Sequence, residues 1–181
     1  SREWKLGHDG MPWFPGETLI TGIGQGAMLV TPLQLGNSTA AFSRRGLRFR
    51  PHLVKAIEKI PQYTLEDTVS QIVGRYELQR EKNWQHVHEA MINVVHGLRG
   101  TAHRISKGIQ YKVAGKTGTA QVFEVAQDEE YEEDEVIEKL RDHALFISYA
   151  PADNPRIAVA VIVENGGHGS SVAAPIARRI M

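Results

Sequence analysis

The stretch VAGKTGTAQ, residues 113–121, decides both the fold and the chemistry to look for in this chain. It joins an apolar lead-in, the triplet Lys116-Thr117-Gly118 and a strand-like exit that continues to Phe123. Glycine within a strand often marks a close approach of a ligand or of another backbone. We therefore predict a β-strand over residues 111–123, with the triplet at its centre.

Lys-Thr-Gly is one of three signature motifs of enzymes that transfer acyl groups through a serine, beside Ser-x-x-Lys and Ser-Asp-Asn. No serine of this chain is followed by lysine three positions later, and none by Asn or Asp two positions later. The sequence thus resembles the back half of an acyl-transfer site without its nucleophile. Because the chain begins at Ser1 without an initiator Met, we expect it to be an excised piece of a longer protein.

Composition is that of a globular domain and gives no sign of nucleic acid as a partner, because 21 basic residues balance 21 acidic ones. The absence of cysteine excludes disulfides and thiolate metal sites. No apolar run approaches the roughly 20 residues needed to span a bilayer, and Ser1 does not open a signal peptide. We expect any anchoring or export segment to lie upstream.

The first half of the chain is predicted to hold two helices. Residues 1–30 are rich in glycine, proline and aromatic residues and are predicted to be irregular. Thr31-Pro32 indicates the start of a helix that runs to about Phe42, and residues 47–80 are predicted to form a weak hairpin or a loop. A second helix is indicated by apolar residues at spacings of three and four. These residues are Trp84, Val87, Met91, Val94, Val95 and Leu98, and Gly97 and Gly100 end the helix.

The second half is predicted to supply most of the sheet. Apolar runs at residues 143–149 and 156–163 indicate two further strands joined by a hairpin turn. The later strand is apolar on both faces, so we expect it to be central and covered by helices. The acidic run at residues 128–138 is predicted to be a solvated excursion with a short helix from about Asp134. A last helix, capped by Ser170 or Ser171, is expected to end at residues 178–180. No linker or repeat divides residues 1–181, so we predict one domain without an internal boundary.

Other site motifs fit the sequence poorly. A phosphate-binding loop that ended in Gly115-Lys116-Thr117 would need glycine where Gln110 stands. His86 and His88 are two residues apart on a helix and point to different faces, so solvated or capping histidines are favoured over a metal site. The acidic run lacks EF-hand spacing. We predict no metal and no cofactor.

Taken in order, several motifs together resemble the C-terminal part of class B penicillin-binding protein transpeptidases. They are GIGQG (22–26), VTPLQL (30–35), GTA (100–102) and KTGTAQ (116–121). Further stretches are similar to the penicillin-binding protein 2 subfamily, the elongation transpeptidases of Gram-negative rods. They are REWK (2–5), PW (12–13), RDH (141–143), AP (150–151), NP (154–155) and ENGG (164–167).

The resemblance implies an α/β fold, with an antiparallel sheet flanked by helices, as in β-lactamases. It also implies five strands, of which two precede this segment. A serine would attack a D-Ala-D-Ala stem peptide, form an acyl-enzyme and pass the acyl group to an amine, and β-lactams would acylate the same serine. The implied roles are catalytic for Lys116, which supplies charge, and for Thr119, whose backbone N–H stabilises the oxyanion. Thr117 would bind the substrate carboxylate, and Gly118 would let substrate approach the strand.

The resemblance also implies partners and a location. The partners are peptidoglycan stem peptides, β-lactam antibiotics, a membrane glycosyltransferase and elongation-complex proteins. The location is the periplasmic face of the bacterial inner membrane. The two missing strands leave a sheet edge open, through which a dimer could form. The alternative is a non-catalytic interaction module, or scaffold, that retains transpeptidase architecture.

Overall fold

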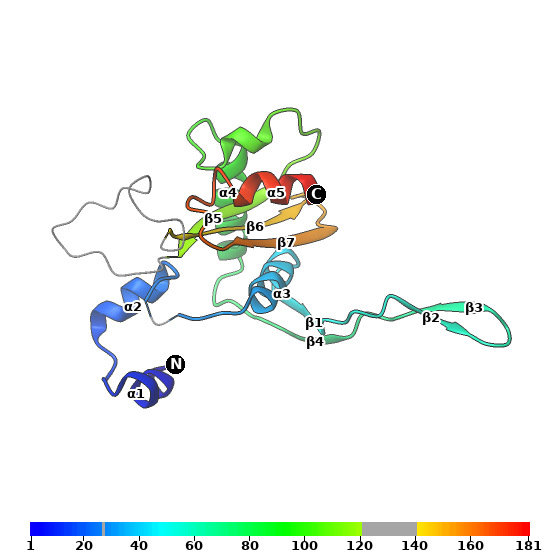
Figure 1. The fold of residues 1–181 in the computed structure, drawn as a ribbon, viewed down its shortest axis with the longest axis horizontal. Coiled ribbons are helices and arrows are strands. Elements are labelled where there is room, and N and C mark those ends of the chain that lie inside the picture. The colour runs from blue at the N-terminus through cyan, green and yellow to red at the C-terminus, as the bar shows by residue number, and fades with distance from the viewer. Residues whose placement is uncertain (27, 121–140) are drawn as a thin grey trace. The chain divides into compact units, whose positions relative to one another are not determined.

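The computed structural model describes residues 1–26, 28–120 and 141–181 (Figure 1). Two compact units can be distinguished, residues 1–31 and residues 32–181. The predicted acidic excursion at residues 128–138 and its helix lie outside the described residues. None of the helices in the described ranges is long and apolar enough to cross a lipid bilayer.

The first unit contains two helices, α1 (Arg2–Asp9) and α2 (Pro15–Gly22), where irregular chain was predicted. That prediction was wrong because local capping outweighs the glycine- and proline-rich composition. The Ser1 hydroxyl accepts the N–H of the third helical residue, and Gly10 ends α1 in the left-handed conformation. Pro15 occupies the first position of α2, where its missing N–H costs nothing.

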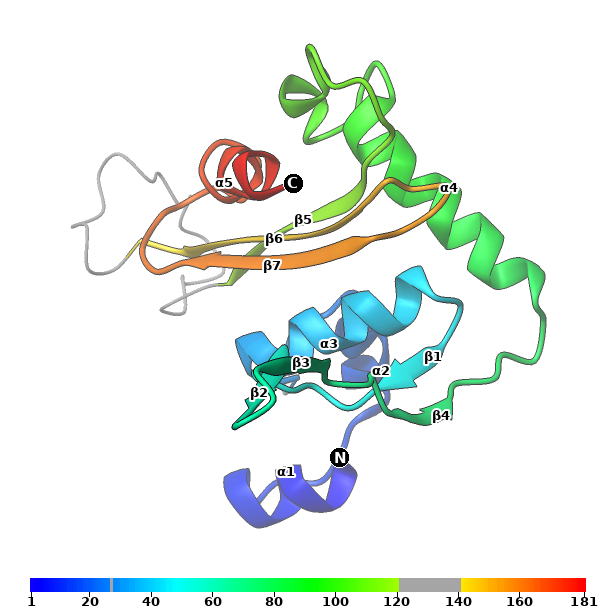
Figure 2. The same cartoon turned by 90° about the vertical axis from the view of Figure 1, so that its right-hand side faces the viewer.

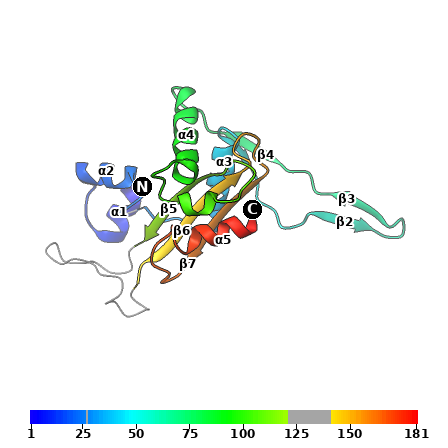
Figure 3. The ribbon, with the colours of Figure 1, turned by 90° about the horizontal axis from the view of Figure 1, so that it is seen from above.

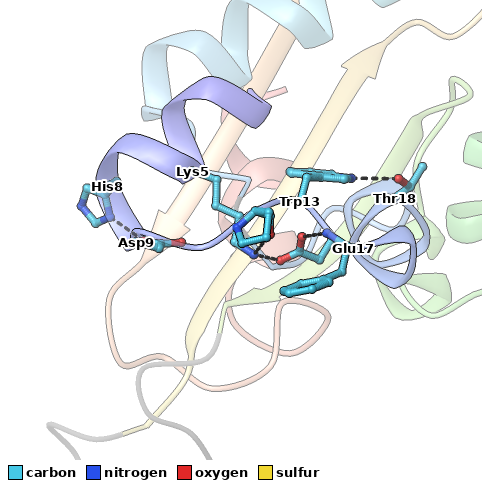
Figure 4. Close-up of polar contacts among 8 residues, drawn as sticks. Lys5, His8, Asp9, Trp13, Glu17 and Thr18 are labelled. Atoms are coloured by element: carbon cyan, nitrogen blue, oxygen red, sulfur yellow. Dashed lines mark hydrogen bonds and ion pairs between the residues drawn. The ribbon is translucent and has the colours of Figure 1, made fainter.

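One buried lysine links these two helices. Lys5 is 5% exposed, and its side chain forms an ion pair with Glu17, as Figure 4 shows. Glu17 also accepts the backbone N–H of Phe14 at 2.7 Å, and Trp13 Nε1 donates to Thr18 Oγ1 at 3.0 Å. The Lys5 hydrogen bond, followed by that of the Phe14 N–H, lowers the pKa of the Glu17 carboxyl. The ion pair therefore links α1 to the first turn of α2.

The second unit is built on a three-stranded antiparallel sheet of β5 (Ala114–Ala120), β6 (His143–Ala150) and β7 (Ile157–Val163). Its three strands are the predicted ones, which confirms the predicted fold class. The strand order β5-β6-β7 makes β6 central, so the expectation that the strand at 156–163 is central was wrong (Figure 3). That strand is apolar on both faces because helices cover both faces, which does not require a strand on each side.

Helices α3 (Pro32–Ser43) and α5 (Ala173–Ile180) lie on opposite faces of this sheet (Figure 2). On the α5 side, Phe146 and Val161 pack with the alanines of that helix. On the α3 side, Tyr149 packs with Met91 of α4 (Lys82–His96), which also contacts β5. A short 3-10 helix, η1 (His103–Ser106), follows α4. These contacts fix β5 relative to α4, and the site depends on that placement.

The α5 helix begins differently from the prediction. Its N-cap is Val172, not Ser170 or Ser171, and no side chain caps it. The backbone carbonyl of Gly169 accepts the N–H of Ala174 at 2.9 Å. A carbonyl thus satisfies an N–H of the first turn, and no serine hydroxyl is needed there.

Residues 47–75 form a ribbon of paired strands, where a weak hairpin or a loop was predicted over residues 47–80. The first pair is β1 (Leu47–Phe49) with β4 (Ile72–Arg75). The second pair, at the far end of the ribbon, is β2 (Ala56–Lys59) with β3 (Thr64–Asp67). Figure 1 shows the β2–β3 end extending away from the sheet of β5, β6 and β7. Only β1 of the ribbon is linked to the site, because it contacts α3, one of the helices beside the sheet.

Candidate active site

Strand β5 holds the four predicted site residues at consecutive positions on the outer strand of the sheet. Lys116 pairs with Ile147 of β6, and Gly118 pairs with Leu145. No other strand in the described ranges pairs with β5, so one of its edges has no strand neighbour. Successive side chains on a strand point to opposite faces, which places Lys116 and Thr117 on different sides of the sheet.

Lys116 lies beside an apolar groove between the sheet and two helices. The groove has a volume of about 510 Å³ and is lined by Lys116, three residues of α3, four of α4 and Ile147. Phe42 and Met91 form part of its wall. The Lys116 side chain is exposed, and its Nζ donates to the Thr117 carbonyl at 2.6 Å. The lysine thus places a positive charge at the rim of a mostly apolar groove.

The hydroxyl of Thr117 meets a second hydroxyl from outside the motif. Thr117 Oγ1 lies 3.2 Å from Thr101 Oγ1, within hydrogen-bond distance. Thr101 belongs to the turn between α4 and η1, where Gly97 and Gly100 allow the backbone to pack tightly. A Cβ on Gly100 would lie 2.3 Å from the Val94 carbonyl oxygen, which no side chain can tolerate.

His96 joins the end of α4 to the start of β5. Its Nε2 accepts the backbone N–H of Val113 at 2.9 Å, and Val113 is fully buried. Burial is the main cause that lowers the pKa of the His96 ring, helped by the charges of Lys112 and His103. A neutral ring is the form that keeps a lone pair on Nε2, so the lowered pKa and the hydrogen bond support each other.

The loop after β7 presses a glycine against the motif strand. A Cβ on Gly169 would lie 2.2 Å from the Leu145 carbonyl oxygen and 2.5 Å from that of Gly118. The same loop is tied to the start of β6, because the Asn165 N–H donates to His143 Nδ1 at 2.9 Å. Gly118 is therefore held by its pairing with β6 and by the close approach of Gly169 in this loop.

Sequence reasoning missed three residues of this arrangement, namely His96, Thr101 and Gly169. Thr101 belongs to the family motif at 100–102, which predicts no contact for it, and the sequence carries no separate signal for His96 or Gly169. Strand-facing contacts between segments 16 and 17 residues apart leave no periodic trace in a sequence. The close glycine approach at residue 169 would be visible only in an alignment of related chains, as an invariant glycine.

The histidine prediction holds for one residue of the pair. His86 is exposed, whereas His88 is half-buried and its Nδ1 lies 2.7 Å from the hydroxyl of Tyr149. Burial raises the pKa of Tyr149 to about 12. In the part of the chain that the structure describes, no three His, Asp or Glu side chains gather as metal ligands.

An antiparallel sheet between helices, with Lys-Thr-Gly on its outer strand, points to the class of serine acyl-transfer enzymes that carry this motif. The family described as the penicillin binding protein transpeptidase domain matches residues 6–181. The chain therefore belongs to that family, as the sequence motifs indicated.

Three comparisons describe its relatives. Peptidoglycan D,D-transpeptidase MrdA of Haemophilus influenzae is 41% identical over 181 residues, which is 100% of this chain and 28% of that protein. Pseudomonas aeruginosa PBP2, solved in complex with WCK 5153, has a TM-score of 0.78 and 44% identity, covering 100% of this chain and 35% of that one. Helicobacter pylori PBP2, solved in a complex with MreC, has a TM-score of 0.73 and 29% identity, covering 98% and 29%. The chain thus spans roughly a third or less of the length of these relatives.

Proposed function

We propose that this chain is the C-terminal part of a peptidoglycan D,D-transpeptidase that cross-links stem peptides through a serine acyl-enzyme and that β-lactams acylate. The observation that carries the proposal is Lys116, which stands on the outer strand of a penicillin-binding fold at the rim of an open apolar groove. The relatives of known activity are peptidoglycan D,D-transpeptidases, which supports the same reaction class for the longer protein.

The four strand residues take distinct parts in this reaction. Lys116 and Thr119 are catalytic: the lysine supplies positive charge to the proton-transfer network, and the Thr119 N–H donates to the oxyanion of the tetrahedral intermediate. Thr117 and Gly118 bind substrate, the first through its hydroxyl and the second by leaving room for close approach. Donors fixed on a strand need no reorganisation as charge develops, which is why such groups contribute strongly to rate.

The nucleophile comes from outside these 181 residues, because no Ser-x-x-Lys occurs among them. The groove beside Lys116 is a suitable docking site for the segment that carries the nucleophilic serine. Its lining is almost wholly apolar, with Val87 and Val94 of α4 facing Phe42 of α3. A segment with an apolar face would bury this surface and set its serine beside the lysine charge.

The setting of the longer protein follows from the same proposal. It acts at the periplasmic face of the inner membrane, with a membrane glycosyltransferase and elongation-complex proteins as partners, and the MreC complex of a relative supports the latter. Residues 1–181 belong to one transpeptidase domain. In the isolated chain the outer edge of β7 has no strand neighbour among the described residues, which favours pairing into a dimer.

The test is Lys116→Ala in the full-length protein, with acylation by a fluorescent penicillin as the readout. We expect the acylation rate to fall by at least ~100-fold, the scale of removing one electrostatic group from such a site. The melting temperature should stay near that of the wild type because the side chain is exposed. Lys55→Ala, which removes an exposed lysine between β1 and β2, far from β5 in sequence, is the matched control. Wild-type acylation in Lys116→Ala would overturn the role.

The missing Ser-x-x-Lys also favours a second candidate, the non-catalytic scaffold. The two are separated by labelling the full-length protein and the isolated chain with the same penicillin. Labelling of the longer protein at a Ser-x-x-Lys serine, with none of the isolated chain, supports the enzyme. A longer protein that has no such motif and takes no label is a scaffold.

A further inference from the structure

Thr101 supplies a hydrogen-bond partner for the Thr117 hydroxyl. Their oxygens are 3.2 Å apart, and either can donate to the other. Each hydroxyl has one proton to donate and two lone pairs that accept. A carboxylate, in contrast, only accepts. A Thr117 hydroxyl that binds a carboxylate must therefore donate its single hydrogen bond to that ligand. Its oxygen can then still accept a hydrogen bond from the Thr101 hydroxyl.

The turn that carries Thr101 is fixed by backbone hydrogen bonds on both sides. The Gly100 N–H donates to the Gly97 carbonyl at 2.9 Å, and the Ala102 N–H donates to the Val94 carbonyl at 3.0 Å. Ala102 is only 1% exposed. Thr101 thus stands on a rigid support, although its own side chain is exposed. A hydroxyl held this way orients its partner better than a hydroxyl on a loose loop.

The same helix is also bound to the start of the motif strand. His96 accepts the Val113 N–H at 2.9 Å, three residues before Lys116 in sequence. Helix α4 and its turn therefore grip β5 at two places, once through the backbone before the motif and once through the hydroxyl within it. These contacts limit how far the backbone that carries Thr101 can move from the backbone that carries Thr117.

We infer that Thr101 is a positioning residue, which orients the Thr117 hydroxyl so that its proton points at the carboxylate of the acyl donor. The inference rests on the proposed function, because it assumes that Thr117 binds a carboxylate. The relay runs from the Thr101 O–H to the Thr117 oxygen, and from the Thr117 O–H to the ligand. Hydrogen bonds in such a chain polarise one another, and the negative ligand fixes their direction.

The test uses the full-length protein with Thr101→Val, which keeps the shape and removes the hydroxyl, and Thr101→Ser, which keeps the hydroxyl. Both are made with Thr117 intact and with Thr117→Val. Pre-covalent affinity and acylation rate are measured separately for benzylpenicillin and for its methyl ester, which lacks the carboxylate. Thr64→Val, at an exposed position of β3, is the control, and melting temperatures confirm folding.

We expect Thr101→Val to weaken pre-covalent affinity for benzylpenicillin by roughly 3- to 10-fold, the worth of one neutral hydrogen bond. Affinity for the ester should not change, Thr101→Ser should recover most of the loss, and Thr101→Val should add nothing in the Thr117→Val background. Additive losses, equal losses on acid and ester, or wild-type affinity in Thr101→Val would each overturn the inference. A Thr117→Val protein that binds benzylpenicillin normally would instead overturn the proposed role of Thr117.

Discussion

Gly169→Ala tests whether the loop after β7 holds the motif strand in place. A Cβ there would lie 2.2 Å from the Leu145 carbonyl oxygen and 2.5 Å from that of Gly118, well inside the 3.0 Å that such contacts respect. Both obstacles are backbone atoms of paired strands and cannot swing aside. The loop and the strand must therefore separate by several tenths of an ångström.

The effect of this substitution can be worked out for both the folding stability and the acylation rate. Overpacking of this kind costs about 1–3 kcal/mol. For a chain of this size each kcal/mol lowers the melting temperature by about 2–4 °C, so a fall of roughly 2–12 °C is expected by circular dichroism. Because a misplacement of ~1 Å can cost ~100-fold in rate, penicillin acylation of the full-length protein should slow by roughly 10- to 100-fold.

Gly36→Ala is the matched control for this experiment. The nearest atom to a Cβ at Gly36 is the Ala160 methyl at 3.8 Å, an ordinary contact. Glycine in a helix interior is less stable than alanine by roughly 0.5–1 kcal/mol, so this variant should melt at or above the wild-type temperature. A Gly169→Ala protein with wild-type melting and acylation would refute the close approach as a constraint on the strand.

Three further predictions concern a histidine, an amide and an ion pair. Because the pKa of His96 is lowered from 6.5, its contribution to stability is present above pH 6.5 and is lost as the pH falls through the lowered value. His96→Gln, whose amide oxygen can still accept, should flatten this acid loss in melting temperature, whereas exposed His86→Gln should not; identical pH profiles would count against it. Thr119→Ala should leave acylation nearly intact, while replacing its backbone N–H by an ester oxygen should slow acylation by roughly 100- to 1,000-fold; similar rates for both would exclude the oxyanion role. Lys5→Met should raise the pKa of the Glu17 carboxyl toward 4.5 in an NMR titration, because the lysine hydrogen bond is the main cause of its lowering; an unchanged value would contradict this.

Much of the fold could be predicted wherever one periodicity was strong. Trp84, Met91 and Val95 are buried on α4, as their spacing indicated, but Val87 is exposed, and Leu98 is exposed and lies beyond the end of the helix. The strands at 143–150 and 157–163 lie where uninterrupted apolar runs predicted them. The order of strands was harder, because an apolar run records burial on two faces and says nothing of hydrogen-bonded neighbours. Helices α1 and α2 were missed because single capping contacts decide them.

The site divides in the same way. The Lys-Thr-Gly strand was predicted from a contiguous motif, and the structure brings its four residues to one outer strand as expected. Their roles remain predictions. The neighbours that hold the strand could not be predicted, since the Thr101 contact and the Gly169 approach join segments that only the tertiary fold brings together. The sequence motif thus predicted the strand, and tertiary packing supplies the contacts that hold that strand in place.

The contacts of His96 and Thr101 have a consequence for exchange between related proteins. Each joins residues 16 or 17 positions apart, so the grip of α4 on β5 is encoded within one short interval, residues 96–117. Grafting that interval into a homologue would transfer the Thr101–Thr117 hydroxyl pair and the His96 contact together. A recombinant protein whose breakpoints lie outside the interval would also keep both contacts. Gly169 lies outside this interval. A recipient protein with a bulkier residue at that position would therefore have a steric clash against the grafted strand even though both contacts were transferred.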